Sequence, residues 1–127
     1  MTAQDIIDTS LAISAENPQD YQSKDICIKW LNMVLAESLA AENRIRQKNE
    51  RQLLTEPVKI SQLYEDVDMD RILCSFCLPL GLAAYMYADK EDEYFYTVYR
   101  QRFLESLQKA AGARETAITD CYGSEVV

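Results

Sequence analysis

Apolar positions are densest in one uncharged run, Ile72 to Ala88, and acidic residues stand on both sides of it. This run predicts a buried central helix over residues 69–88, around which the rest of the chain packs. Pro79 is expected to bend the helix, because proline lacks a backbone donor and clashes with the preceding turn. Gly81 is expected to let a neighbouring helix approach closely at the bend.

The same run has the length of a transmembrane helix, which needs about 17–25 apolar residues. Pro79 and Gly81 interrupt its middle, however, and Ser75 and two cysteines dilute its apolar character. No cluster of Lys or Arg lies beside either end to orient insertion into a membrane. The pattern therefore favours a core helix over a membrane span.

Two more helices are predicted from apolar residues spaced three and four positions apart. Residues 24–52 carry this spacing mainly in their first half, so residues 42–52 are expected to project beyond the core. Residues 91–111 form a further helix, which Asp89 caps and Gly112 ends. Its apolar stripe consists of Phe95, Tyr99, Phe103, Leu107 and Ala110.

The beginning of the chain and the segment around Pro57 give weaker patterns. Thr2 begins a short helix over residues 3–15, and the pattern leaves open whether this helix packs on its own core or on a neighbouring copy. Pro57 breaks any helix near it, and the alternation of Val58 and Ile60 predicts a short extended segment.

Residues 113–127 are polar, lack periodicity and are expected to form an extended tail. Together the elements predict an all-α protein: a small bundle of about four helices with a projecting second helix, a short extended segment near Pro57 and an extended C-terminal tail. The chain is expected to divide into an N-terminal helix or arm (1–16), a helical core domain (23–112) and the tail (113–127).

Composition narrows the classes of function. The chain has 127 residues, 48% of them hydrophobic, which suits one folded domain that needs no disulfide or metal ion. Its 21 acidic and 13 basic residues give a formal net charge of −8, which disfavours broad attraction to nucleic acid or anionic membranes. No basic stretch followed by an apolar stretch opens the sequence, so we expect synthesis in the cytosol without export.

Motifs for catalysis are not found in the sequence. It contains no histidine, no phosphate-binding loop and no glycine-rich dinucleotide fingerprint. The acidic run at residues 65–70 lacks the glycine and the final glutamate of a calcium-binding loop. We therefore expect a protein that is not an enzyme and has no cofactor and no bound metal ion.

Four cysteines, at positions 27, 74, 77 and 121, are expected to remain thiols. Cys74 and Cys77 have the spacing of a redox or zinc motif. A redox pair needs an exposed helix N-terminus, however, and a zinc site here would need all four cysteines. We favour the interpretation that they are small buried apolar side chains and keep thiol or zinc chemistry as an alternative.

Side chains that the core does not require are candidates for contacts with partners. The basic group in residues 44–51 is either a solvated helix end, whose cations suit the helix dipole, or a surface that faces protein or DNA. Tyr94 falls off the apolar stripe of its helix, and aromatic residues are enriched at interfaces. The candidate contact residues are Arg44, Arg46, Lys48, Arg51, Pro57, Val58, Ile60, Tyr94, Ile118 and Tyr122.

Five stretches in a fixed order carry a resemblance to a known family. They are Trp30-Leu-Asn-Met-Val-Leu-Ala-Glu37, Glu42-Asn-Arg-Ile-Arg46, Pro57-Val-Lys-Ile60, Leu78-Pro-Leu-Gly-Leu-Ala83 and Asp120-Cys-Tyr122. Together they resemble the small helical head–tail connector (adaptor) proteins encoded beside the capsid genes of tailed bacteriophages. The resemblance covers residues 24–123, and Leu80 departs from the tyrosine that is usual at its position in the family.

The resemblance implies a structural virion protein that is made in the host cytoplasm and located in the neck of the virion. Such proteins assemble as a homo-oligomeric ring, usually of twelve copies, between the portal protein and the tail or stopper proteins. DNA passes through the bore without sequence-specific binding, and no membrane is involved. The rival interpretation is a cytosolic helical interaction or regulatory module that acts as a dimer.

Overall fold

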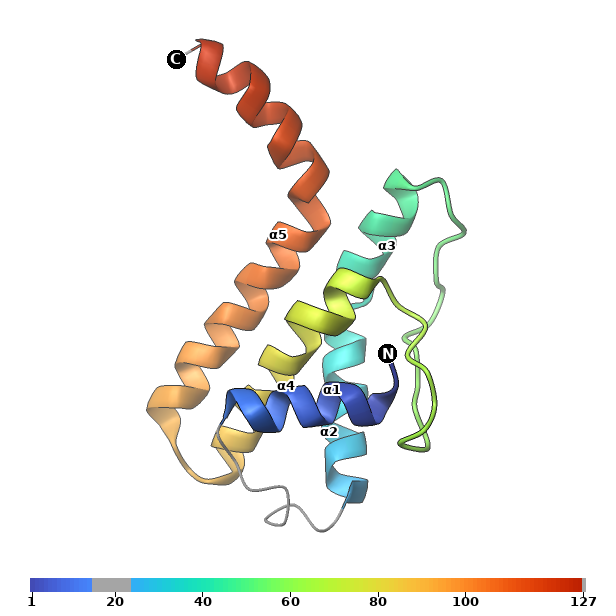
Figure 1. The fold of residues 1–127 in the computed structure, drawn as a ribbon, viewed down its shortest axis with the longest axis vertical. Coiled ribbons are helices and arrows are strands. Elements are labelled where there is room, and N and C mark those ends of the chain that lie inside the picture. Colours follow the sequence, from blue (N-terminus) through green and yellow to red (C-terminus); the bar gives the residue numbers. More distant parts are fainter. Residues whose placement is uncertain (15–23, 127) are drawn as a thin grey trace.

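The computed structural model describes residues 1–14 and 24–126, with side chains described as far as Gly112. Within that part the protein is helical and has no strand, so the predicted all-α class is confirmed (Figure 1). The helices are α1 (Ala3–Ile13), α2 (Lys24–Glu37), α3 (Leu39–Lys48), the π-helix η2 (Leu73–Cys77), α4 (Leu78–Asp89) and α5 (Glu93–Val126). None of these helices is long and apolar enough to cross a membrane over the residues described.

The uncharged run forms the centre of the fold, as predicted. η2 and α4 follow each other without a break, and α1, α2 and α5 all pack against α4 (Figure 1). Fully buried side chains from this run make up much of the core: Leu73, Leu78, Leu82 and Met86. Phe103 of α5 is also fully buried against them.

The response to Pro79 is a widened turn. Pro79 is buried in the first turn of α4 and has no N–H to donate to the carbonyl four residues earlier. Immediately before it, the Leu78 N–H donates to the carbonyl of Leu73, five residues back, as in a π-helix. A π turn next to the proline makes room for its ring without ending the helix.

At Gly81, two helices approach α4 closely. A Cβ atom at this position would lie 2.9 Å from Val34 Cγ1 of α2 and 3.0 Å from the ring of Phe103 of α5. Both distances are shorter than van der Waals contact, so only glycine fits without displacement. The close approach that the sequence predicts at Gly81 is therefore present, and it involves helices on two sides.

The N-terminal helix packs on its own chain. A reciprocal cap begins α1, in which the Asp5 N–H donates to Thr2 Oγ1 (3.2 Å) and the Thr2 N–H donates to Asp5 Oδ2 (3.0 Å). Its buried face contributes Ala3, Ile6, Ile7 and Leu11 to the common core. Of the two arrangements that the sequence left open, the structure has the one within the chain.

The predicted single helix over residues 24–52 is wrong in two respects. The helix is divided at Ser38, whose buried hydroxyl donates back to the Val34 carbonyl (2.8 Å), a bond that bends helices. It ends at Lys48, and a turn with a positive φ of 56° at Glu50 reverses the chain. The second part, α3, does not project, because it packs against α5.

Residues 49–70 form a non-helical segment, which we call the strap, and which runs beside α2 and α3 (Figure 1). Two asparagines hold it through paired bonds to backbone. The Ile60 N–H donates to Asn32 Oδ1 (2.8 Å) and Asn32 Nδ2 donates to the Ile60 carbonyl (2.9 Å). Asn43 makes the same pair of bonds with Leu54 (2.8 and 3.0 Å). The non-helical backbone predicted around Pro57 is thus part of a longer segment fixed by side-chain amides.

The strap also pairs with the start of the chain. The Ala3 N–H donates to the Glu65 carbonyl (2.9 Å), and the Val67 N–H donates to the Met1 carbonyl (2.9 Å). These bonds satisfy backbone N–H and C=O groups of both segments that are not paired within a helix or a sheet. The strap therefore joins α1 to the α2–α3 layer.

Both predicted ends of the last helix need correction. At its start, Asp92 and not Asp89 caps α5, since Asp92 Oδ1 accepts from the Phe95 N–H (3.2 Å). The helix does not stop at Gly112, because α5 continues to Val126 through residues that the sequence predicts as an extended tail. A single glycine lowers helix stability by only about 1 kcal/mol relative to alanine, so it does not by itself end a helix.

We predict that Gly81→Ala lowers the free energy of unfolding by about 1–3 kcal/mol, as overpacking of a core does. Alanine is the better helix former, so a gain in stability would contradict the close approach of Val34 and Phe103. Urea denaturation followed by circular dichroism measures the change. In a double-mutant cycle with Val34→Ala, the two substitutions together should cost less than their sum.

Candidate interaction surfaces

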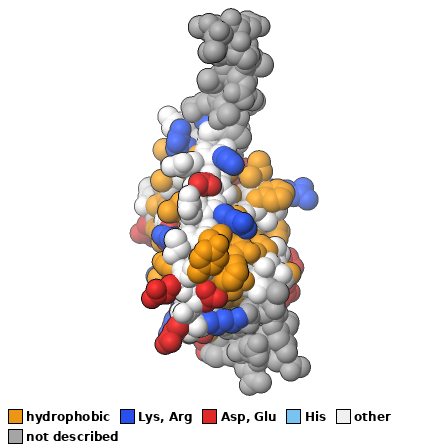
Figure 2. Space-filling view, turned by 90° about the vertical axis from the view of Figure 1, so that its left-hand side faces the viewer, with side chains coloured by type: hydrophobic (Ala, Val, Ile, Leu, Met, Phe, Trp, Pro, Cys, Tyr) orange, Lys and Arg blue, Asp and Glu red, His pale blue; other side chains and the backbone are white. Residues whose placement is uncertain are grey.

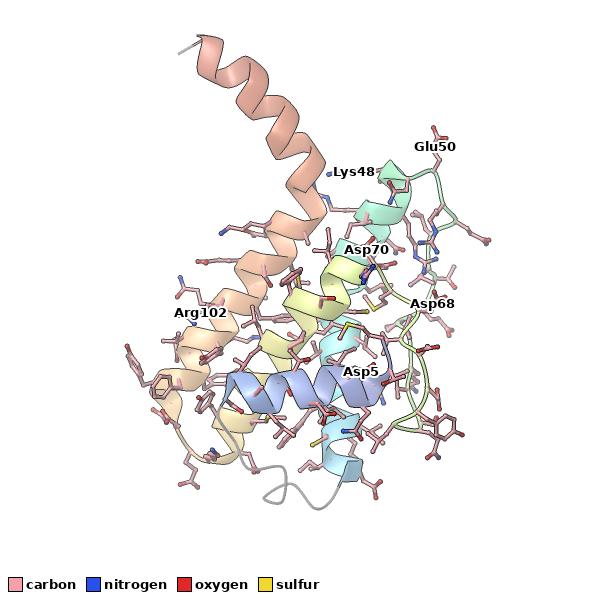
Figure 3. All side chains as sticks on the ribbon, in the orientation of Figure 1. Asp5, Lys48, Glu50, Asp68, Asp70 and Arg102 are labelled. Atoms are coloured by element: carbon pink, nitrogen blue, oxygen red, sulfur yellow. The ribbon has the colours of Figure 1, made fainter. Side chains whose placement is uncertain are left out.

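The first candidate site, the basic group, has a buried ion pair at its centre. Arg46 is only 6% exposed, Glu42 is fully buried, and Arg46 Nε donates to Glu42 Oε1 (2.9 Å). Arg46 also donates to the carbonyls of Gln52 and Asp68 (3.3 Å each), and the Asp70 N–H donates to Glu42 Oε2 (2.9 Å). Figure 3 shows Asp68 and Asp70 beside α3, where the strap ends.

The prediction that Arg46 faces a partner is therefore wrong. Its guanidinium joins α3 to both ends of the strap inside the fold, which leaves it no surface for contact. The i,i+4 spacing of Glu42 and Arg46 is the signal for this pair. Burial was not predicted, because most such pairs lie on the surface.

The other three basic candidates differ in position. Lys48 is half-buried and points toward α5, where Nζ donates to the carbonyl of Ala111 (Figure 3). Arg44 and Arg51 are exposed. The predicted basic surface thus consists mainly of Arg44 and Arg51, with Lys48 at its edge.

The candidate residues around Pro57 also differ in how far they are buried. Ile60 is 3% exposed and belongs to the core, so its proposed role as a contact residue is wrong. Val58 is half-buried against the core, and Pro57 is exposed. Pro57 and Val58 line a shallow hollow of about 350 Å³ together with Asn32, Ala36, Glu56 and Lys59.

Tyr94 belongs to a larger group of rings at the start of α5, which we call the aromatic cluster: Tyr87, Tyr94, Phe95 and Tyr99. The ring of Tyr87 stacks on Phe95 (centroids 5.1 Å apart) and on Tyr99 (5.3 Å), and Tyr94 meets Phe95 edge-on (5.2 Å). Tyr94 is 72% exposed and Phe95 is 42% exposed. Figure 2 shows rings gathered on the surface of the lower part of the molecule. Tyr94 was predicted to be exposed, whereas the cluster around it was not predicted.

Cations already lie over this cluster. Lys90 Nζ is 5.7 Å from the centre of the Tyr87 ring, and Arg102 Cζ is 5.2 Å from the centre of the Tyr99 ring. Both distances are within the range of cation–π attraction. The rings therefore present faces that attract positive charge at the surface.

An acidic hollow lies beside the aromatic cluster. It has a volume of about 500 Å³ and is lined by Ala88, Glu91, Asp92, Glu93 and Tyr96. Glu91, with a positive φ of 60°, forms the turn between α4 and α5. The carboxylates of this turn give the hollow a negative potential.

A third hollow, the α3–α5 groove, lies between α3 and α5. Its volume is about 310 Å³, and it is lined by Glu37, Ala40, Ala41, Arg44, Leu104, Leu107, Gln108 and Ala111. Leu104 is 45% exposed there. Small residues on α3 and leucines on α5 give this groove a largely apolar floor.

Below this groove, Glu37 joins three helices. Tyr85 Oη donates to Glu37 Oε1 (2.7 Å), and Arg100 pairs with the other carboxylate oxygen. Burial alone would raise the pKa of Glu37, but the hydrogen bonds from Arg100 and Tyr85 hold it below its ordinary value. Burial and the bond to Glu37 raise the pKa of Tyr85 to about 12. The group is a structural link between α2, α4 and α5.

The cysteines at positions 27, 74 and 77 are buried thiols, which agrees with the favoured interpretation of these residues. Burial raises the pKa of Cys74 to about 11 and also raises that of Cys77. Among the residues described, no His, Cys, Asp or Glu side chains are grouped so as to hold a metal ion. The side chains of Ile118, Cys121 and Tyr122 lie outside the described part.

No protein-family model, curated protein or solved structure matches this chain. The function is therefore inferred from the residues and their geometry.

We predict that Arg46→Ala lowers the free energy of unfolding by about 3–5 kcal/mol, because it leaves the Glu42 carboxylate buried without its cation. Urea denaturation followed by circular dichroism gives the value. Arg44→Ala is the matched control on the same helix and should change stability by less than about 0.5 kcal/mol. Equal effects of the two substitutions would show that the ion pair is not a structural element.

We also predict that the buried thiols react slowly. With the pKa of Cys74 near 11, the thiolate fraction at pH 8 is on the order of 0.1%, and the thiolate is the reactive form. In a Cys121→Ser variant, the three remaining thiols should react with Ellman's reagent on the order of tenfold or more slowly in native protein than in denaturant. Equally fast reaction in both states would contradict their burial.

Proposed function

We propose that this chain is a head–tail connector (adaptor) protein of a tailed bacteriophage. In this role it forms a ring between the portal protein and the tail, and DNA passes through the bore. The observation that carries the proposal is that the four stretches of the resemblance whose side chains are described converge on the contacts that hold the fold together.

The stretch 42–46 supplies both members of the buried ion pair, which fixes the two ends of the strap. The stretch 57–60 ends at Ile60, whose side chain is in the core and whose backbone pairs with Asn32. Asn32 lies in the stretch 30–37. Three stretches far apart in the sequence thus form one connected unit.

The stretch 78–83 supplies the centre of the core. It contains the buried Leu78 and Leu82, the proline that follows the π turn, and Gly81 in contact range of α2 and α5. These positions determine the fold through their packing and hydrogen bonds. A likeness to another family at such positions is therefore expected to reflect a shared fold.

The surface suits a protein that works through contacts. The aromatic cluster and the acidic hollow lie where α4 turns into α5, the exposed Arg44 lines the α3–α5 groove, and the exposed Arg51 lies at the start of the strap. A subunit of a ring needs at least two such surfaces, because each copy meets a neighbour on either side. The net charge of −8 also suits a bore through which DNA slides. Basic surfaces bind the phosphates of DNA, so an acidic protein would not hold the DNA in place.

The alternative, a helical module that acts as a dimer, is favoured by the α3–α5 groove. An apolar groove with an exposed leucine is typical of sites that receive a helix. Light scattering after size-exclusion chromatography distinguishes a species of two copies from a larger ring.

The decisive experiment for the connector function is deletion of the gene from the phage genome with complementation from a plasmid. We expect the deletion to yield DNA-filled heads and separate tails, seen by electron microscopy, and the plasmid to restore virions. Normal virions without any copy of the gene would reject the proposal. Infectious titre gives the same comparison in numbers.

Substitutions in the plasmid copy test which surfaces matter. Arg44→Glu with Arg51→Glu, and separately removal of residues 113–127, should abolish complementation while circular dichroism shows a folded protein. The two arginine substitutions are at exposed positions, and such changes usually alter stability by less than about 0.5 kcal/mol each. Lys29→Glu, an exposed charge reversal on α2, is the control and should complement. Arg46 is left unchanged, because its loss is expected to destabilise the fold and would confound a test of the surface.

A further inference from the structure

The two ends of the molecule carry opposite charge. The turn from residue 89 to residue 93 contains four acidic residues and one basic residue, a formal charge of −3. Residues 44–51 contain four basic residues and one acidic residue, a formal charge of +3, of which Arg46 is neutralised by the buried Glu42. In Figure 1 the turn lies at the lower end of the molecule, and the last turn of α3 lies at the upper end of the α2–α3 layer, below the C-terminal part of α5.

The acidic end has a shape as well as a charge. The residues that line the acidic hollow alternate in the sequence with those of the aromatic cluster, and Tyr94 of the cluster, 72% exposed, directly follows Glu93 of the hollow. Figure 2 shows acidic side chains grouped beside the exposed rings, while most basic side chains lie higher on the same face. A hollow lined by carboxylates next to ring faces fits a cation carried on a long side chain.

A protein cation fits this hollow better than a metal ion does. The residues described contain no acidic group of three or more that could surround a metal ion, so the carboxylates are too dispersed for inner-sphere ligation. A guanidinium is planar, reaches several acceptors at once and stacks on aromatic rings. Arg102, over the Tyr99 ring, already shows this stacking on the same surface.

The opposite end supplies cations of this kind. Arg51 is exposed in the first residues of the strap, and Arg44 is exposed on α3 about one turn before the helix ends. Each is arginine, the cation that pairs with carboxylates and rings at interfaces. The bond from Lys48 to the Ala111 carbonyl ties this end of α3 to α5.

We infer that the acidic hollow and aromatic cluster of one copy bind the Arg44 and Arg51 end of a second copy of this chain. The inference rests on the proposed ring and names the contact that builds it. Because the two surfaces are different patches on opposite ends, the contact is heterologous. Such contacts close into rings, or continue as filaments, and do not stop at two copies.

Charge makes this contact selective and sensitive to salt. Copies that each carry −8 repel one another overall, so attraction has to come from a local pairing of opposite charges. Salt screens exposed charges beyond about 8 Å at physiological ionic strength, so the two ends of one copy act independently. Association should therefore weaken as salt is raised.

The test reverses the charge of each end in turn in the full chain. One variant carries Glu91→Lys and Glu93→Lys, and the other carries Arg44→Glu and Arg51→Glu. Sedimentation equilibrium of the unaltered protein should show a mean mass that rises with concentration past two copies. Each variant alone should associate at least on the order of tenfold more weakly, because its two ends now carry like charge.

An equimolar mixture of the two variants is the sharpest arm of this test. Each reversed end then meets a complementary end on the other variant, so alternating assembly should return to the level of the unaltered protein. If the substitutions weakened association for a reason other than this pairing of ends, mixing the two variants would not restore it. Circular dichroism of each variant checks that both remain folded.

Matched single substitutions test whether the rings of the aromatic cluster matter more than exposed rings elsewhere on the surface. Tyr94→Ala should weaken association, while Tyr64→Ala should not, although Tyr64 on the strap is 78% exposed. Lys29→Glu on α2 is the control for a charge reversal away from both ends.

Three results would each overturn the inference: an unaltered protein that stays monomeric at every concentration, a mixture that fails to restore assembly, or association that stops at two copies. The last result would indicate a two-fold contact. Failure here is distinct from failure of the connector function. If the end-reversed variants assemble and complement while the gene deletion still blocks virions, only the inferred contact is wrong.

Discussion

The ion pair between Glu42 and Arg46 holds together parts of the chain that no helix connects. Its hydrogen bonds reach Gln52 at the start of the strap and Asp68 and Asp70 at its end. The strap in turn pairs with the first residues of the chain and so positions α1. A buried pair of charges is costly unless its remaining donors and acceptors are satisfied, and here backbone groups of the strap satisfy them.

The helical content of the fold was predictable, since apolar spacing and one uncharged run identify most of the core residues. What the spacing missed are polar residues with buried roles. Arg46 was predicted to be exposed, because a charged residue on a polar stretch is usually solvated. Asn32 and Asn43, eleven residues and about three helical turns apart, gave no signal of the strap they bind, because their partners are backbone groups.

The candidate surfaces were predictable only one residue at a time. Tyr94 was expected to be exposed because it falls off the apolar stripe, whereas Phe95 and Tyr99 were assigned to the core with Phe103. In the structure only the later part of that stripe is deeply buried, and the rings at the start of α5 stack on Tyr87 from α4 instead. Contacts between side chains of different helices cannot be read from the periodicity of either one.

The π turn before Pro79 also changes the phase of the central helix. A π turn is equivalent to one residue inserted into an α-helix, and one residue corresponds to a rotation of about 100° about the axis. Side chains before the turn are thereby rotated relative to those of α4, and Phe76 is 68% exposed between the buried Cys74 and Cys77. The direction in which the strap joins this helix, at Asp70 beside Glu42, depends on that extra residue. Proline at position 79 thus helps to set the direction, about the helix axis, from which the strap reaches the central helix.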